Sequence, residues 1–214
     1  MFGAGGNDTF YVDSLGDVVV EADASAAGGI DLVVSALAAY TLGATVENGR
    51  ISATGTADLN GNSLNNLLIA GDGNNIIRGG LGTDTISYET ALAGVSVDLS
   101  LVVAQATGGS GSDTLINFEN LTGSNFDDLL TGNAVNNVLL GGDGDDTLLG
   151  GLGNDVLDGG RGNDVLDGGS GVDTASYASA QGAVTVDLGI AGPQNTVNAG
   201  TDTLIGIVNL IGSN

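Results

Sequence analysis

The chain has 214 residues, and its acidic residues outnumber its basic ones by 26 to 3, which gives a formal net charge of −23. It has no cysteine, histidine or lysine, which excludes disulfides, thiolate or imidazole zinc sites, serine–histidine catalysis and lysine Schiff bases. The negative charge disfavours nucleic acid as a partner. Because 42% of the residues are hydrophobic and no apolar run approaches the roughly 18 residues of a membrane span, we expect a buried core and no such span.

Short repeats rich in glycine and aspartate begin near the amino terminus. The segment Gly3–Tyr11 reads "GAGGNDTFY", and it departs at one position from the pattern GGxGxDxUx, in which U is a large apolar residue. Asp8 is the aspartate of this unit. The pattern predicts a degenerate β segment over residues 1–60.

Weaker copies of the same unit follow. Three of them run from Gly61 to Ser87, and only the last contains the aspartate, Asp84. A further single unit, "GGSGSDTLI" at Gly108–Ile116, contains Asp113. We therefore predict weak repeats with linking strands over residues 61–122.

The strongest signal is a run of six nine-residue units without a gap. It covers residues 123–176 as "GSNFDDLLT", "GNAVNNVLL", "GGDGDDTLL", "GGLGNDVLD", "GGRGNDVLD" and "GGSGVDTAS". The third to fifth units fit the pattern at every position. A flexible glycine linker would not keep a fixed period with an apolar residue at position eight, so this run predicts a folded repeat region.

Each unit is interpreted as a turn followed by a very short strand. Glycines at positions one, two and four permit positive φ and close backbone approach, and glycine costs roughly 1 kcal/mol in a helix interior. The last three positions place one side chain inward between two outward ones, so Leu148, Leu157 and Leu166 are predicted core residues. The outward Asp158 and Asp167 are expected to be solvated and to lie on opposite sheets.

A longer period of 89 residues lies above the short one. Residues 84–125 and 173–214 align without a gap and share 21 of 42 positions. The copies include "GVSVDLS" from Gly94 and "AVTVDLG" from Ala183, which alternate in polarity and are predicted to be longer strands. We expect residues 177–214 to be an incomplete second copy of the linking module, and the sequence to be a piece of a longer protein.

The run over residues 123–176 resembles the calcium-binding nonapeptide repeats of the RTX family of secreted bacterial proteins. The resemblance implies an all-β fold, a parallel β-roll or β-solenoid with two units per turn, in which calcium lies between successive turns. Stacking at about 4.8 Å would align Asp128, Asp146 and Asp164 on one edge, and Asn137, Asp155 and Asp173 on the other. Carboxylates this close repel one another, and a divalent cation with 6 to 8 oxygen ligands reverses the sign of that interaction.

The candidate calcium ligands are of two kinds. Side-chain candidates are the aspartates at position six: Asp8, Asp84, Asp113, Asp128, Asp146, Asp155, Asp164 and Asp173. By resemblance, backbone carbonyls at positions one and three of one turn, with those at positions two and four of the next, complete the sites. The candidates at positions one and three are Gly141, Asp143, Gly150, Leu152, Gly159, Arg161, Gly168 and Ser170. The pairs Asp146 with Asp164, and Asp155 with Asp173, are expected to form the best sites.

Several other residues are expected to be structural. Asn66, Asn75 and Asn137 replace the aspartate and predict weak or ion-free turns. Tyr88 and Tyr177 recur after aspartate units and are expected to pack at edges of the roll. The three arginines, Arg50, Arg78 and Arg161, share no register and are expected to form local surface pairs.

The sequence predicts a calcium-binding structural module of a secreted bacterial protein, with no catalytic residues in this segment. The resemblance implies export by type I secretion machinery, folding on calcium outside the cell, and a possible contact with the cell surface or polysaccharide. Two alternatives remain open: part of an extracellular polysaccharide lyase or epimerase-like enzyme, or part of an adhesin. The first usually needs a basic residue beside the acids, and ice-binding adhesion needs a threonine file on the turns, which position three lacks.

Overall fold

The computed structural model describes residues 1–3, 5–21 and 28–213. These residues form strands and turns without a helix, which confirms the predicted all-β class, and none of them forms a helix that could cross a membrane. Two compact units are present. The first comprises residues 1–90, 101–106 and 110–118, and the second comprises residues 91–100, 107–109 and 119–214.

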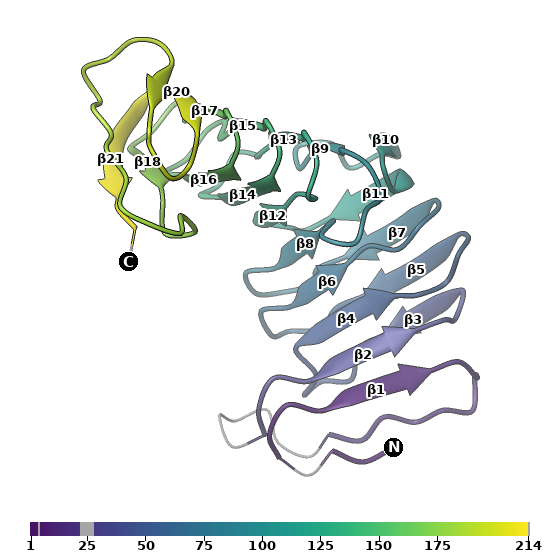
Figure 1. Cartoon of the computed structure of the whole chain (residues 1–214). Helices are drawn as coiled ribbons and strands as arrows, with labels where there is room; N and C mark the ends of the chain where they lie inside the picture. The colour runs from purple at the N-terminus through teal and green to yellow at the C-terminus, as the bar shows by residue number, and fades with distance from the viewer. Residues whose placement is uncertain (4, 22–27, 214) are drawn as a thin grey trace. The chain divides into compact units, whose positions relative to one another are not determined.

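The first unit is a stack of short parallel strands in two sheets (Figure 1). One sheet contains β1 (Thr9–Val12), β2 (Leu32–Ser35), β4 (Asn48–Ile51), β6 (Leu67–Ile69) and β8 (Thr85–Ser87), in that order. The other contains β3 (Ala39–Thr41), β5 (Ala57–Asn60), β7 (Asn75–Arg78) and β11 (Gly111–Ile116). Strand β10 (Gln105–Gly108) has residues in both units.

The second unit has the same two-sheet plan. One sheet contains β12 (Asn120–Thr122), β14 (Val138–Asp143), β16 (Val156–Arg161), β18 (Asp173–Ser176) and β21 (Ile207–Ile211). The other contains β9 (Ser96–Asp98), β13 (Leu129–Thr131), β15 (Thr147–Leu149), β17 (Val165–Asp167), β20 (Thr201–Ile205) and the short antiparallel β19 (Gln194–Asn195). Successive repeat units alternate between the two sheets.

Two nonapeptides make one turn of the second unit. Val138 pairs with Val156, and Thr147 with Val165, each eighteen residues along the chain. This register confirms the predicted parallel roll, because a period of nine residues returns the same position to the same sheet after every second unit. Figure 1 shows the resulting rungs β14 and β16 side by side, with β13 and β15 following the same succession.

The core is a double file of leucines between the sheets. The residues at position eight are 0 to 1% exposed, and they are Leu130, Leu139, Leu148, Leu157, Leu166 and Ala175. The predicted core residues are therefore confirmed. Because only one side chain per nine residues faces inward, the core is narrow and each leucine makes a large share of the local apolar burial.

Glycine is required at three positions of each regular unit for two different reasons. Positions two and four have positive φ, as at Gly160 (φ 95°) and Gly162 (φ 144°), where a side chain would strain the backbone. Position one does not adopt positive φ in the regular units. There, as at Gly141, a β-carbon would collide with the aspartate at position six of the same unit, so space rather than φ excludes a side chain.

In each 89-residue copy, a longer segment of chain, here called an excursion, replaces one regular turn of the roll. In the first unit Ile76 pairs with Thr114, and in the second unit Val165 pairs with Thr203, each a step of 38 residues instead of eighteen. The predicted strand at "GVSVDLS" forms as the three-residue β9, which pairs with β13. The predicted strand at "AVTVDLG" is wrong, since residues 183–189 form no strand.

Asp158 contradicts the expectation of a solvated surface residue. Its side chain is 5% exposed, and it accepts hydrogen bonds from Ser176 Oγ at 2.9 Å and Ser179 Oγ at 2.5 Å. The segment that follows the last repeat covers it. Asp167, on the opposite sheet as predicted, is only half-buried and accepts the Gly169 N–H at 3.1 Å.

Truncating one core leucine should therefore cost far more than truncating an exposed one. We expect Leu157→Ala to lower the free energy of unfolding in calcium by about 2 to 5 kcal/mol, because the narrow core cannot close over the cavity. Leu152→Ala, at a side chain that is 57% exposed, should change it by only about 0.5 kcal/mol. Urea unfolding followed by circular dichroism measures both, and equal losses would contradict this description of the core.

Candidate metal centres

The residues at position six form one file on each edge of the second unit. On one edge, the backbone N–H of Asp128 donates to Asp146 Oδ1 at 2.8 Å, and that of Asp146 donates to Asp164 Oδ1 at 3.0 Å. On the other edge, Asn137 N–H donates to Asp155 Oδ1 at 2.8 Å, and Asp155 N–H donates to Asp173 Oδ1 at 2.9 Å. The stacking predicted for both edges is therefore present, and it uses one oxygen of each carboxylate.

In these two files of the second unit, the second carboxylate oxygen of three aspartates has no hydrogen-bond partner among the described residues. Oδ2 of Asp146, Asp155 and Asp173 is buried and accepts no hydrogen bond from any described residue. The side chains themselves are 0 to 1% exposed. Leaving a buried acceptor unsatisfied costs about 1 to 3 kcal/mol, and more when the group is charged, so these oxygens require a proton or a cation.

The position-one glycines leave space beside these oxygens. A β-carbon on Gly141 would meet both Asp146 Oδ2 and the carbonyl oxygen of Gly159, one turn further on. The same holds on the other edge, where a β-carbon on Gly150 would meet Asp155 Oδ2 and Gly168 O at 2.6 Å. Each position-one glycine therefore opens a cradle in which a carboxylate oxygen and a carbonyl oxygen from successive turns converge.

Burial and mutual repulsion make these carboxylates weak acids in the absence of a cation. Burial, followed by the charges of Asp128 and Asp164, raises the pKa of Asp146 to about 8. Burial, followed by the charge of Asp202, raises the pKa of Asp164 to about 7. The pKa of Asp155 is also raised, first by burial and then by Asp173.

The less regular units satisfy their position-six side chains internally. In the unit that begins at Gly123, Ser124 occupies position two and donates its N–H to Asp128 Oδ2 at 2.5 Å and its hydroxyl to Oδ1 at 2.8 Å. Asn133 N–H donates to Asn137 Oδ1 at 2.7 Å in the same way. In these two units the residue at position two is not glycine, and protein donors satisfy the side chain at position six. Asp128 therefore differs from predicted ligands such as Asp146, whose Oδ2 has no partner among the described residues.

In the first unit, the position-six residues differ in their partners. Asn62 N–H donates to Asn66 Oδ1 at 2.8 Å, and Asn66 N–H donates to Asp84 Oδ1 at 2.8 Å. A β-carbon on Gly79 would meet Asp84 Oδ2 and a carbonyl oxygen, so Asp84 has the same glycine cradle as Asp146. Asp8 is partly buried and donates its N–H to Asp31 Oδ1 at 2.8 Å.

Each 38-residue excursion ends on an aspartate that is covered by a tyrosine. Asp113 accepts Asn75 N–H at 2.9 Å and the Tyr88 hydroxyl at 3.0 Å, on different oxygens. Burial, then the charge of Asp113, raises the pKa of Tyr88 well above its usual value and keeps its hydroxyl a donor. Tyr88 is 1% exposed, as expected for a packing residue.

The second copy repeats this arrangement. Asp202 accepts the Asp164 N–H at 3.1 Å and the Thr196 hydroxyl at 2.9 Å. Tyr177 is 4% exposed, and its pKa is raised by burial and then by the charge of Asp202. Asp113 and Asp202 each accept a hydrogen bond from a hydroxyl, whereas Asp146 Oδ2 accepts none from the described residues. The aspartates of the excursions therefore need a cation less than Asp146 does.

A second set of stacked polar side chains, those at position five, was not predicted from the sequence. Side chains at position five accept the backbone N–H of the residue one turn later, as in Asp145 N–H to Asp127 Oδ1 at 2.9 Å and Asn163 N–H to Asp145 Oδ1 at 2.7 Å. On the other edge, Asn154 N–H donates to Asn136 Oδ1 at 2.8 Å. The signal was available, because position five is Asn or Asp in most units, but the pattern GGxGxDxUx leaves it unspecified.

The backbone carbonyls at position three, which are predicted calcium ligands, already accept hydrogen bonds within the roll. Arg161 O accepts the Gly144 N–H at 2.9 Å, and Ser170 O accepts the Gly153 N–H at 3.1 Å. A carbonyl oxygen has two lone pairs, so these bonds leave one for a cation. Asp143 and Leu152 occupy the equivalent position one turn earlier, where Asp143 pairs with Arg161 and Leu152 with Ser170.

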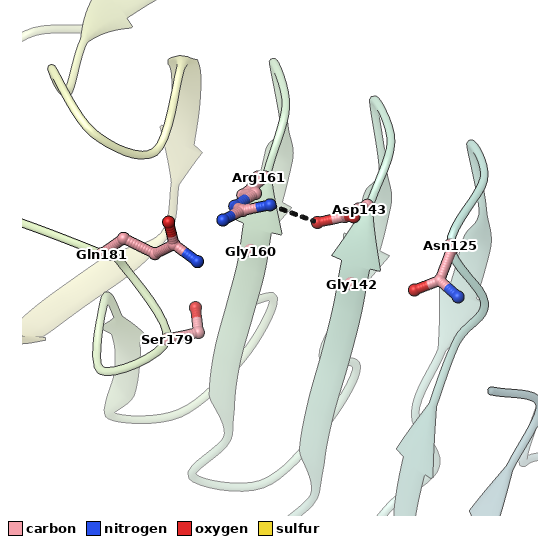
Figure 2. Close-up of a pocket in the computed structure, with 7 residues that line it drawn as sticks. All are labelled: Asn125, Gly142, Asp143, Gly160, Arg161, Ser179 and Gln181. Carbon is pink, nitrogen blue, oxygen red and sulfur yellow. Dashed lines mark ion pairs between the residues drawn. The ribbon is translucent and has the colours of Figure 1, made fainter.

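The side chains at position three line a pocket of about 340 Å³ on the second unit (Figure 2). Asn125, Asp143 and Arg161 follow one another there on successive turns, with Ser179 and Gln181 at one side. Arg161 Nη1 lies 3.8 Å from Asp143 Oδ1, which confirms the expected surface pair. The pocket lining contains one carboxylate, and that carboxylate already faces a guanidinium.

Comparison with known proteins agrees with this geometry. A family model of the RTX calcium-binding nonapeptide repeat (4 copies) matches residues 59–89, 122–157 and 140–175. No curated protein matches the chain. The chain thus contains RTX calcium-binding nonapeptide repeats, and calcium is their ligand. The buried oxygens and glycine cradles fit this ion, which prefers hard oxygen donors at about 2.3 to 2.6 Å and accepts backbone carbonyls.

Neighbouring aspartates should therefore respond differently to the same substitution. We expect Asp146→Asn to raise the calcium concentration at half-folding by about tenfold, because it removes a charged ligand oxygen. Asp145→Asn should leave it nearly unchanged, since position five already accommodates Asn154 and Asn163. Calcium titrations followed by circular dichroism compare the two variants, and a larger shift for Asp145→Asn would contradict the assignment.

Acid should stabilise the calcium-depleted roll. The pKa values of Asp146 and Asp164 are raised above those of an unfolded chain, so the folded state binds protons more tightly. Their contribution is complete below about pH 4 and is lost as pH rises through about 7 to 8. We expect the circular dichroism of the calcium-depleted chain to show more β-structure at about pH 5 than at about pH 9, and the difference to shrink in the double variant Asp146→Asn/Asp164→Asn. Less β-structure at the acidic pH would contradict the raised pKa values.

Proposed function

We propose that this chain, which contains RTX calcium-binding nonapeptide repeats, is a module of a secreted bacterial protein that folds when it meets calcium outside the cell. The supporting observation is the set of buried oxygens without protein partners, Oδ2 of Asp146, Asp155 and Asp173. Their burial is unfavourable without a cation and favourable with one. The same side chains therefore oppose folding where calcium is scarce and support it where calcium is abundant.

The stabilisation expected from bound calcium is large enough to decide whether the chain is folded. A cation at tenfold excess over its dissociation constant stabilises the folded state by about 1.4 kcal/mol. Four sites would add about 5 to 6 kcal/mol, which is comparable to the whole stability of a small domain. With a net charge of −23 and one core side chain per nine residues, the chain has little else to hold the turns together.

Export of the unfolded chain by type I secretion machinery is part of this proposal. It is supported by the repeats themselves, since the RTX family that they resemble is secreted in this way. An acidic chain that gains its structure only outside the cell would remain unfolded during transport. The proposed location is therefore extracellular.

We further propose that this segment acts as a scaffold and that any catalytic activity belongs to other parts of the protein. In the regular units the described acidic side chains at position six lie in the files, where each is committed to a neighbouring turn. The polar pocket offers an Arg161–Asp143 pair rather than two carboxylates that could serve as acid and base. Binding and ordering, not turnover, are the functions that this arrangement supports.

Calcium should determine whether the chain is ordered. We expect the circular dichroism of the 214-residue chain to be mostly that of coil in chelator and that of β-structure in millimolar calcium. Magnesium at the same concentration should not replace calcium, because it requires a near-octahedral shell and loses water reluctantly. A β-spectrum in chelator at neutral pH would contradict the proposal.

A further inference from the structure

Three carboxylates converge at the amino-terminal end of the first unit, outside the residues that the family model matches. Oxygens of Asp8, Glu21 and Asp31 all lie within 4.8 Å of one another. Asp8 and Asp31 occupy equivalent places on successive turns, as the pairing of Thr9 with Leu32 shows. Glu21 belongs to no nonapeptide, so this group is not a copy of the two-aspartate arrangement in the second unit.

Backbone contacts hold Glu21 in this place. Val20 N–H donates to Met1 O at 2.9 Å, and Gly3 N–H donates to Val20 O at 3.2 Å, so the chain before Glu21 runs beside the first three residues. The Thr45 hydroxyl donates to the Glu21 carbonyl at 2.8 Å. The glutamate is therefore positioned from both sides.

Asp31 supplies independent evidence for a ligand. Its side chain is 1% exposed, Oδ1 accepts the Asp8 N–H at 2.8 Å, and the buried Oδ2 accepts no hydrogen bond from the described residues. Burial raises the pKa of Asp31, as do the charges of Glu21, Glu47 and Asp8. A carboxylate oxygen in this state, directed into a group of acids, requires a positive partner.

Gly3 opens the same kind of cradle as the regular units. A β-carbon on Gly3 would collide with Glu21 Oε2 and lie 2.9 Å from Asp8 Oδ2. At Gly141, the corresponding space lies between Asp146 Oδ2 and the carbonyl of Gly159. The Glu21 carboxylate therefore occupies the place of the next turn's carbonyl, and it adds a third negative charge.

The sequence offers few positive charges to this group, since its three basic residues are arginines. Arg161 pairs with Asp143, and Arg78 donates to Asn60 at 3.0 Å. Arg50 is exposed on β4 and has no ion pair within the described part of the chain. The terminal ammonium donates to Val18 O at 2.6 Å. A cation from solution would supply the positive charge that the buried Asp31 carboxylate favours.

We infer that Asp8, Glu21 and Asp31 form a calcium site of their own, which fastens the amino-terminal segment to the first turns of the roll. Calcium rather than magnesium fits a set of carboxylates from three separate parts of the chain, because its shell is larger and more tolerant in geometry. Three carboxylates give this site more negative charge than the paired aspartates of the repeats. It should therefore bind calcium more tightly, since ligand charge tunes calcium affinity.

Hydrogen exchange at increasing calcium concentration tests this site in the unaltered chain. We expect the amides of β1 and β2 to become protected at a calcium concentration about tenfold below that which protects β14 to β17. If β14 to β17 respond and β1 and β2 do not, this inference fails while the proposed function stands. If neither part responds to calcium, both fail.

A matched pair of variants then assigns the ligand. Glu21→Gln should remove one bound calcium per chain, counted by equilibrium dialysis, and should abolish the early protection of β1 and β2 while β14 to β17 keep theirs. Glu89→Gln, at an exposed glutamate outside the group, should change neither quantity. An unchanged ion count and unchanged protection in Glu21→Gln would overturn the assignment.

Discussion

Repulsion between carboxylates stacked on successive turns is the constraint on which this structure depends. Asp146 and Asp164 are one turn apart, and the backbone N–H of Asp146 donates to Asp164 Oδ1. Both carboxylates are almost completely buried. At this spacing the repulsion is about 1 kcal/mol in water and about 3 kcal/mol at an effective dielectric constant of 20, repeated at each turn. The burial of one leucine per nonapeptide does not offset this repulsion at every turn. Each carboxylate must therefore be neutralised where it lies.

The chain meets this constraint in two ways, because protein donors satisfy some of the carboxylates and a cation is needed for the others. Ser124 donates to Asp128, and hydroxyls of Tyr88 and Thr196 donate to the aspartates that end the excursions, so these groups are satisfied by protein. Where glycine occupies position two in the regular units, the second oxygen of the aspartate remains for a cation, as at Asp146. Protein donors therefore cover the aspartates of the excursions and of the first unit of the run, and we propose that calcium serves the aspartates of the regular units.

Features that follow from the period alone could be predicted from the sequence. A nine-residue repeat in a two-sheet roll must place Leu157 inward and Asp155 above Asp173, because every second unit returns to the same sheet. Features that depend on chain outside the repeat could not. Asp158 accepts the hydroxyl of Ser179, which lies beyond the last repeat, and the Tyr88–Asp113 contact depends on where a 38-residue excursion returns. The space beside Gly141 was visible only once Asp146 and Gly159 had positions in three dimensions.

We propose that calcium lies in the position-one cradles between successive turns. An anomalous difference map, at a wavelength where calcium scatters anomalously, from crystals of the 214-residue chain grown with calcium would locate the ions. We expect peaks beside Gly141, between Asp146 Oδ2 and Gly159 O, and beside Gly150, between Asp155 Oδ2 and Gly168 O. We expect none beside Asp113, where Tyr88 donates. A well-ordered roll with no peak in either cradle would contradict this proposal.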